Sequence, residues 1–215
     1  MAILDGSVLD DARTIVARYP DGRERSAVMP LLYLVQSVEG YVTRDGMREI
    51  GELLGVTTAE VEAVATFYTM YRMHPTGEHL IAVCTNLACM LRGAREVLGE
   101  AFAATGQQPG QEISDDGRFS VHEEECLGVC DVAPAVQLNV ANHDAVTPAR
   151  MRQLVDALRN GEIPDPSRGP AFTSYRHACR VLAGLDQPST AVATAGAGAI
   201  PASPARPNPA EGSPV

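Results

Sequence analysis

The chain has little positive charge and few aromatic side chains. Its 215 residues include 17 Lys and Arg against 27 Asp and Glu, which gives a formal net charge of −10, and Trp is absent. A nucleic-acid partner needs clustered basic residues to contact phosphates, so this charge balance argues against one. The same balance argues against docking on an anionic membrane surface.

Long apolar runs are also missing. No segment approaches the roughly 18 apolar residues of a membrane-spanning helix, and the N-terminus lacks the basic and apolar stretches of a signal peptide. We therefore expect a cytoplasmic protein that does not insert into the membrane. Structural disulfides are rare in that reducing compartment, and five cysteines, an odd number, suit a disulfide framework poorly.

The first third of the chain has the apolar spacing of short helices. Thr57 and Glu60 form a capping-box pattern, and Gly40 and Gly55 each follow a helical segment as a C-terminal cap. This pattern predicts a small helical bundle within residues 1–76. Its helices are expected over about residues 9–19, 26–38, 47–54 and 57–68.

The pattern changes after residue 76. Strands alternating with helices indicate an α/β domain over residues 77–161, so the fold class is α+β or α/β. Residues 162–187 form a predicted extension with one short helix near 175–182. Residues 188–215 are rich in small residues and Pro, and we predict a disordered tail because they bury too little to offset ordering entropy. The α/β domain has predicted strands at 80–84, 118–121 and 135–139 and predicted helices at 88–102 and 147–159.

Four of the five cysteines form two local pairs. Cys84 and Cys89 are separated by four residues, Cys126 and Cys130 are separated by three, and 36 residues lie between the two pairs. Each pair lies beside the end of a predicted strand, where the loops of α/β sheets converge on sites. Two pairs of thiolates supply the two ligands that each iron of a 2Fe–2S cluster needs. Gly128 should let the backbone bend so that its N–H groups reach a sulfur.

Other interpretations of these residues remain open from spacing alone. Zinc is the strongest competitor, because four thiolates also suit a tetrahedral zinc ion. A disulfide or unrelated buried cysteines are further alternatives, whereas a thioredoxin-type dithiol is disfavoured because no pair has the two-residue spacing. Cys179 is interpreted as a packed or free thiol. We interpret the run 123–125 as a solvated acidic face, with tuning of a nearby cluster as the alternative, and assign surface or turn positions to the histidines: His74, His79, His122, His143 and His177.

Several segments together resemble one family. The runs DGRFS at 116–120 and CLGVCDVAP at 126–134, with residues 65–71 and 83–89, closely resemble the 24 kDa subunit family of NADH-quinone oxidoreductase (respiratory complex I). The resemblance covers about residues 15–160. Ala88 departs from it, since relatives often carry Pro there, but this change should not affect ligation.

The resemblance implies an N-terminal helical bundle followed by a thioredoxin-like ferredoxin domain. It implies one 2Fe–2S cluster, with Cys84, Cys89, Cys126 and Cys130 as its ligands. It also implies a flavoprotein partner that binds NADH and FMN, and further subunits of a peripheral arm on the cytoplasmic side of the inner membrane. The sequence fits this division of labour, because it has no G-x-G-x-x-G after a strand. We therefore expect an electron-transfer subunit with no catalytic residues of its own.

Three rival functions remain open. An equivalent diaphorase subunit of an NAD-linked hydrogenase or formate dehydrogenase would keep the site and change the assembly. A free ferredoxin would need no helical bundle for docking. A zinc-stabilised interaction protein would bind zinc without sulfide. Thioredoxin-like folds often hold a cis proline at the place that Pro134 occupies here, so we expect a cis peptide bond there.

Overall fold

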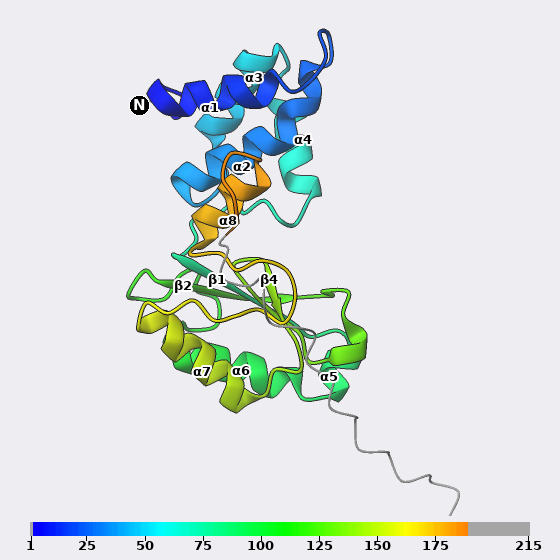
Figure 1. Cartoon of the computed structure of the whole chain (residues 1–215), viewed down its shortest axis with the longest axis vertical. Coiled ribbons are helices and arrows are strands. Elements are labelled where there is room, and N and C mark those ends of the chain that lie inside the picture. Colours follow the sequence, from blue (N-terminus) through cyan, green and yellow to red (C-terminus); the bar gives the residue numbers. More distant parts are fainter. Residues whose placement is uncertain (1, 189–215) are drawn as a thin grey trace, which may run out of the picture.

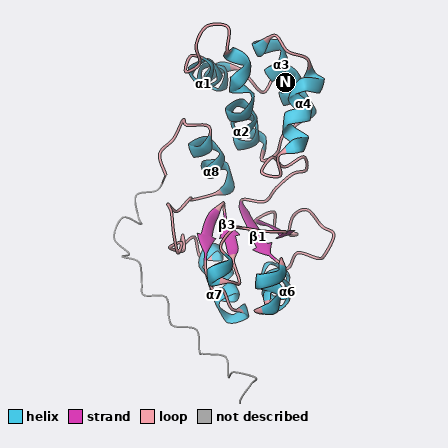
Figure 2. Ribbon diagram, turned by 90° about the vertical axis from the view of Figure 1, so that its right-hand side faces the viewer, coloured by secondary structure: helices cyan, strands magenta, loops and turns pink. Residues whose placement is uncertain are grey.

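The computed structural model describes residues 2–188, so almost all of the tail predicted over 188–215 lies outside the described residues. The helical bundle occupies one end of the molecule, and a sheet lies between it and a further layer of helices (Figures 1 and 2). Among the helices over residues 2–188, none has the length and apolar character that crossing a bilayer requires.

The predicted helices of the first third are confirmed. Thr57 and Glu60 form the predicted capping box, and Gly40 and Gly55 end their helices with φ of +85° and +65°. Leu31 and Leu34 of the second helix are fully buried, because the other helices pack around it. The bundle contains a short 3-10 helix, η1 (Glu24–Ala27), and the α-helices α1 (Gly6–Val16), α2 (Val28–Glu39), α3 (Arg44–Leu54) and α4 (Thr58–Phe67).

The sheet is mixed, with strand order β2-β1-β3-β4. β1 runs parallel to β2, and β3 is antiparallel to both β1 and β4. The parallel pair requires a crossover, which two helices supply. Ile81 and Val83 face the helical layer, whereas Leu80 and Ala82 face the bundle side of the sheet. The elements are β1 (His79–Cys84), α5 (Leu87–Leu91), α6 (Ala94–Thr105), β2 (Phe119–Glu124), η2 (Cys130–Val132), β3 (Val136–Leu138), β4 (Ala141–His143) and α7 (Pro148–Arg159).

Two predictions for the sheet region are corrected. The single helix predicted over 88–102 is two helices, because Gly93 adopts a left-handed φ of +91° between α5 and α6. The strand β4 is not indicated by the sequence. It follows a two-residue turn in which Asn139 and Val140 both have positive φ, and valine is a residue that rarely adopts this conformation.

The helix predicted near 175–182 is present as α8 (Tyr175–Leu182). It does not stand apart from the rest of the chain: it packs against α2 of the bundle, and its first backbone N–H donates to Glu78 O at 2.9 Å, next to the start of β1. Figure 1 shows α8 between the bundle and the sheet. The division into 1–76, 77–161 and 162–187 stays a prediction.

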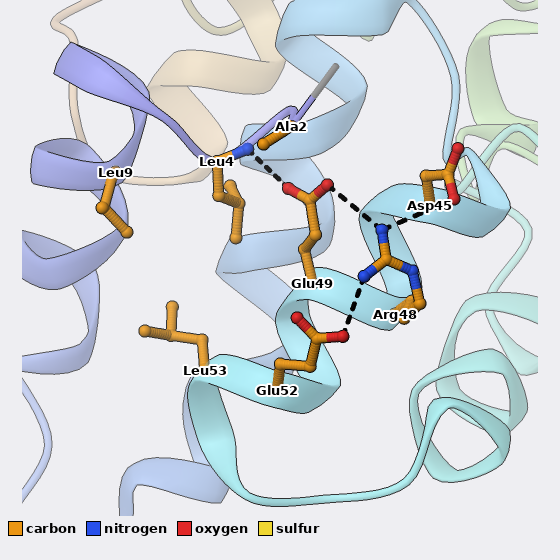
Figure 3. Close-up of a pocket in the computed structure, with 8 residues that line it drawn as sticks. All are labelled: Ala2, Leu4, Leu9, Asp45, Arg48, Glu49, Glu52 and Leu53. Atoms are coloured by element: carbon orange, nitrogen blue, oxygen red, sulfur yellow. Dashed lines mark hydrogen bonds and ion pairs between the residues drawn. The ribbon is translucent and has the colours of Figure 1, made fainter.

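The N-terminal segment is tied to α3. The backbone N–H groups of Ile3 and Leu4 donate to Glu49 Oε2 at 2.9 and 2.7 Å. Around these contacts lies an open cavity of about 450 Å³, whose far wall is formed by Arg48 and Glu52 of α3 (Figure 3). None of the residues lining it is a cysteine, so this cavity is not the predicted site.

The close approach of the parallel strands β1 and β2 depends on Gly77. A Cβ at this position would lie 2.7 Å from backbone atoms of Phe119 at the start of β2. We expect Gly77→Ala to lower the free energy of unfolding by about 1–3 kcal/mol, as overpacking does elsewhere. Denaturant unfolding monitored by circular dichroism measures this change.

Gly99 provides the matched control. It lies within α6, and a Cβ there meets nothing within 4 Å. Gly99→Ala should therefore raise the free energy of unfolding by about 0.5–1 kcal/mol, because alanine loses less entropy in a helix. Equal stability of the wild type and the Gly77→Ala protein would contradict this account of the strand contact.

Candidate metal centre

Two neighbouring strand ends bring the four cysteines together. Cys84 is the last residue of β1, and Cys126 follows the end of β2 by two residues. The parallel register places Cys84 opposite Glu124, so both strands deliver a cysteine to the same edge of the sheet. Cys89 lies on the short helix α5, and Cys130 begins the 3-10 helix η2.

The thiols are close enough to influence one another. Burial is the main cause that raises the pKa of Cys89 to about 11; a backbone hydrogen bond with Ala135 opposes this rise, and the Cys84 and Cys130 thiols add to it. The charge of Cys126 is the main cause that raises the pKa of Cys130, and burial and the charge of Cys84 add to it. Charge therefore connects the members of each local pair and also the two pairs.

This donor set suits a cluster of two irons. Within residues 2–188, no group of three or more Cys, His, Asp or Glu is placed to hold one metal ion. Two local pairs of thiols match a cluster in which each iron takes two thiolates. The four cysteines are thus the residues that could hold a 2Fe–2S cluster.

The surroundings of the two pairs differ. Cys84 and Cys89 are buried in an apolar cluster, whereas Cys126 and Cys130 are exposed. Gly128 has a φ of +73°, and its N–H donates to Cys126 Sγ at 3.3 Å, as the sequence predicts. Such hydrogen bonds to sulfur help set the potential of a cluster. The apolar cluster contains Ala94, Val129, Val132, Ala133 and Ala135, and the Ala133–Pro134 peptide bond is cis, as expected.

Comparison with known proteins identifies the family. Residues 12–159 match the family model described as thioredoxin-like [2Fe-2S] ferredoxin. The chain belongs to this family. The predicted fold class and the single 2Fe–2S cluster follow from this membership.

Two relatives are similar over most of this ferredoxin-family chain. The E subunit of NADH-quinone oxidoreductase from Mycobacterium tuberculosis is 43% identical over 175 residues, which cover 81% of this chain and 68% of the relative. NADH-quinone oxidoreductase subunit 2 of Thermus thermophilus is 42% identical over 147 residues, which cover 68% of this chain and 81% of the relative.

A solved structure is similar over part of the chain. It is an NAD⁺-reducing [NiFe]-hydrogenase in the H₂-reduced state, with a TM-score of 0.50 and 25% identity. The match covers 56% of this chain and 20% of that chain.

The fifth cysteine of this ferredoxin-family chain lies elsewhere. Cys179 is fully buried in α8, where it accepts a hydrogen bond from Gln36 Nε2 at 3.4 Å. Burial raises its pKa to about 11. The interpretation of Cys179 as a packed thiol is confirmed, and it lies in a different apolar cluster from Cys84 and Cys89.

Two interpretations of polar residues need correction. His79 and His143 are buried, not surface residues, and burial lowers the pKa of His143 to about 4. The acidic run is solvated only in part: Glu123 and Glu125 are exposed, but Glu124 is half-buried and forms an ion pair with Arg72. No local pattern indicates this ion pair, because its members lie 52 residues apart.

Cysteine replacement tests the ligand assignment. Cys126→Ala removes a thiolate from the exposed pair and leaves no side-chain ligand, so we expect iron and acid-labile sulfide to fall from about two of each per chain to well below one. Chemical analysis of the anaerobically purified full chain measures both contents. Cys179→Ala is the control and should keep both unchanged. Full iron and sulfide in Cys126→Ala would remove Cys126 from the ligand set.

Proposed function

We propose that this chain is the electron-transfer subunit of an NADH:quinone oxidoreductase, with its cluster held by Cys84, Cys89, Cys126 and Cys130. The observation that carries the proposal is the meeting of these thiols at one sheet edge, in a chain 43% identical to a mycobacterial subunit of such an enzyme. When bound, a 2Fe–2S cluster takes up and releases one electron at a time. The enzyme activity belongs to the assembly, because the chain has no phosphate-binding loop of its own.

The chain's own residues hold the group and control its access to water. The buried thiols Cys84 and Cys89, together with the surrounding small and branched apolar side chains, exclude water on one side. The exposed thiols Cys126 and Cys130 open the other side to a redox partner. Because only one pair of thiols is exposed, single electrons would enter and leave the site on the side of Cys126 and Cys130.

The proposed partner is a flavoprotein subunit that binds NADH and FMN and exchanges single electrons with this chain. Its support is an exposed apolar surface beside the site. Leu87, Met90 and Leu91 of α5 are 63%, 40% and 72% exposed, on the same short helix as the ligand Cys89. We call these three residues the α5 surface. Clustered exposed apolar side chains mark protein interfaces, and an interface here would place the flavin near the thiols.

The proposed location follows from the assembly. The chain would lie in a peripheral arm on the cytoplasmic side of the inner membrane, bound through other subunits. Its net charge of −10 suits attachment to protein partners better than direct contact with anionic lipid.

A second candidate is the equivalent diaphorase subunit of an NAD-linked hydrogenase or formate dehydrogenase. The similarity to the NAD⁺-reducing hydrogenase favours it. It ranks second because identity is 25% to that chain and 43% to the mycobacterial NADH-quinone oxidoreductase relative. Proteins that copurify with the chain separate the two assemblies.

NADH-dependent reduction tests the function. In the complex purified from cells, anaerobic NADH should produce the EPR signal of a reduced 2Fe–2S centre and should require a copurified FMN protein. The same preparation carrying Cys126→Ser should show an altered signal or none. A chain that copurifies with no flavoprotein, yet holds its iron, would instead support a free ferredoxin.

Substitution in the α5 surface tests the partner contact. Leu91→Asp replaces an exposed leucine whose burial would contribute about 1.5–3 kcal/mol, so we expect flavoprotein binding to weaken by about tenfold or more. Iron content should stay at the wild-type level. Leu182→Asp on α8, at a position 45% exposed, is the matched control and should bind normally. Undiminished binding by Leu91→Asp would rule out this surface.

A further inference from the structure

The positively charged side chain of Arg72 reaches from the bundle side of the molecule to the sheet. It lies in the segment between α4 and β1, and its Nη2 donates to Glu124 Oε1 at 3.0 Å. His122 Nε2 contacts Arg72 Nη2 and lies 2.9 Å from the same Glu124 oxygen. The side chains of Arg72 and Glu124 are only 24% and 23% exposed, so water and salt screen them less than surface charges.

This ion pair lies next to the cysteines. Glu124 is opposite Cys84 in the parallel register of β1 and β2, and side chains opposite one another leave the sheet on the same face. Arg72, Glu124 and Cys126 also line one cavity of about 160 Å³ between the bundle and the sheet. The pair therefore shares a partly enclosed space with a proposed cluster ligand.

The bundle holds Arg72 at this place. The Arg72 backbone N–H donates to Gln36 Oε1 at 2.7 Å, and the Gln36 side chain is fully buried in α2. Gln36 Nε2 in turn donates to Met70 O at 3.2 Å and to Tyr175 Oη of α8 at 2.9 Å. The Nε of Arg72 is itself buried and has no hydrogen-bond partner among the described residues. A guanidinium with this little hydration acts strongly on nearby charge.

We propose that Arg72 and Glu124 are a fixed pair of opposite charges whose individual effects on the reduction potential of the four-cysteine site oppose each other; this inference rests on the proposed function. An added electron makes the site more negative, so the Glu124 carboxylate disfavours it and the Arg72 guanidinium favours it. The two effects largely cancel in the wild type. Removing the Arg72 charge alone leaves the effect of Glu124 unopposed and lowers the potential. Removing the Glu124 charge alone leaves the effect of Arg72 unopposed and raises it.

His122 contributes little net charge to this arrangement. Burial is the main cause that lowers its pKa, the Glu124 contact raises it, and the charge of Arg72 lowers it again. Measurement at one pH of about 8, above the ordinary histidine pKa of about 6.5, keeps this group neutral throughout. The comparison then depends on the fixed charges alone.

The test is a redox titration of the full chain carrying its cluster, followed by EPR with dithionite as the electron donor. Arg72→Gln should lower the midpoint potential and Glu124→Gln should raise it. The double variant should return close to the wild-type value, and Arg72→Lys, which keeps the charge, should stay near it. An effect of structural loosening alone would not reverse its sign between the two single variants.

Arg152 and Glu100 provide the matched control. They form an ion pair between α7 and α6, on the face of the sheet away from the bundle. Arg152→Gln and Glu100→Gln should leave the midpoint potential unchanged. A shift as large as that of the Arg72 and Glu124 variants would overturn the inference, because any charge change would then have the same effect.

Iron and sulfide contents, measured first, separate the possible failures. Variants that keep both contents but show no shift, or shifts of the same sign, overturn the role of Arg72 and Glu124 alone. Where Arg72→Gln does not keep its iron, Glu124→Gln decides, and no upward shift there overturns the inference. A wild-type chain without iron and sulfide overturns the proposed function and this inference together.

Discussion

The parallel pairing of β1 with β2 is the constraint on which the site depends. The two cysteine pairs are far apart in sequence and meet only because both strands end at the same edge of the sheet. Gly77 permits this pairing to begin, since its lack of a side chain leaves room for the backbone of Phe119. A slip of one residue in the register would turn Cys84 to the opposite face of the sheet. Strand register therefore determines whether four thiols make one site or two unrelated pairs.

Much of the fold follows from local chemistry. The capping box at Thr57 and the glycine caps at Gly40 and Gly55 are each indicated by a few neighbouring residues, and the structure contains all of them. What the sequence did not indicate depends on rarer conformations. The turn before β4 uses Val140 at positive φ, a choice made by the packing of the sheet and not by the residue.

Some features of the candidate site can also be predicted from the sequence, whereas others depend on the tertiary structure. The spacing of the cysteines beside strand ends predicts the four ligands, and the position of Cys179 far along the chain predicts that it is not one of them. The unequal burial of the two pairs is a tertiary property, because it depends on which neighbours cover Cys84 and Cys89. The partner of Glu124 likewise cannot be predicted from neighbouring residues. Three glutamates in a row suggest a solvated face, but in the folded chain Arg72 from the bundle side forms an ion pair with Glu124.

These contacts give the bundle a physical role beyond docking. Gln36 is fully buried and uses its amide to hold Met70 and Arg72, in the segment after α4, and Tyr175 of α8, which is far from them in the chain. A buried polar network of this kind is stable only when its members are satisfied together, so it fixes their relative positions more strictly than apolar packing does. Because α8 supplies Tyr175, the segment after the sheet completes the network that begins in α2. The helices at one end of the molecule thereby fix the position of a charge at the edge of the sheet where the thiols meet, and a ferredoxin domain without them would lack that charge.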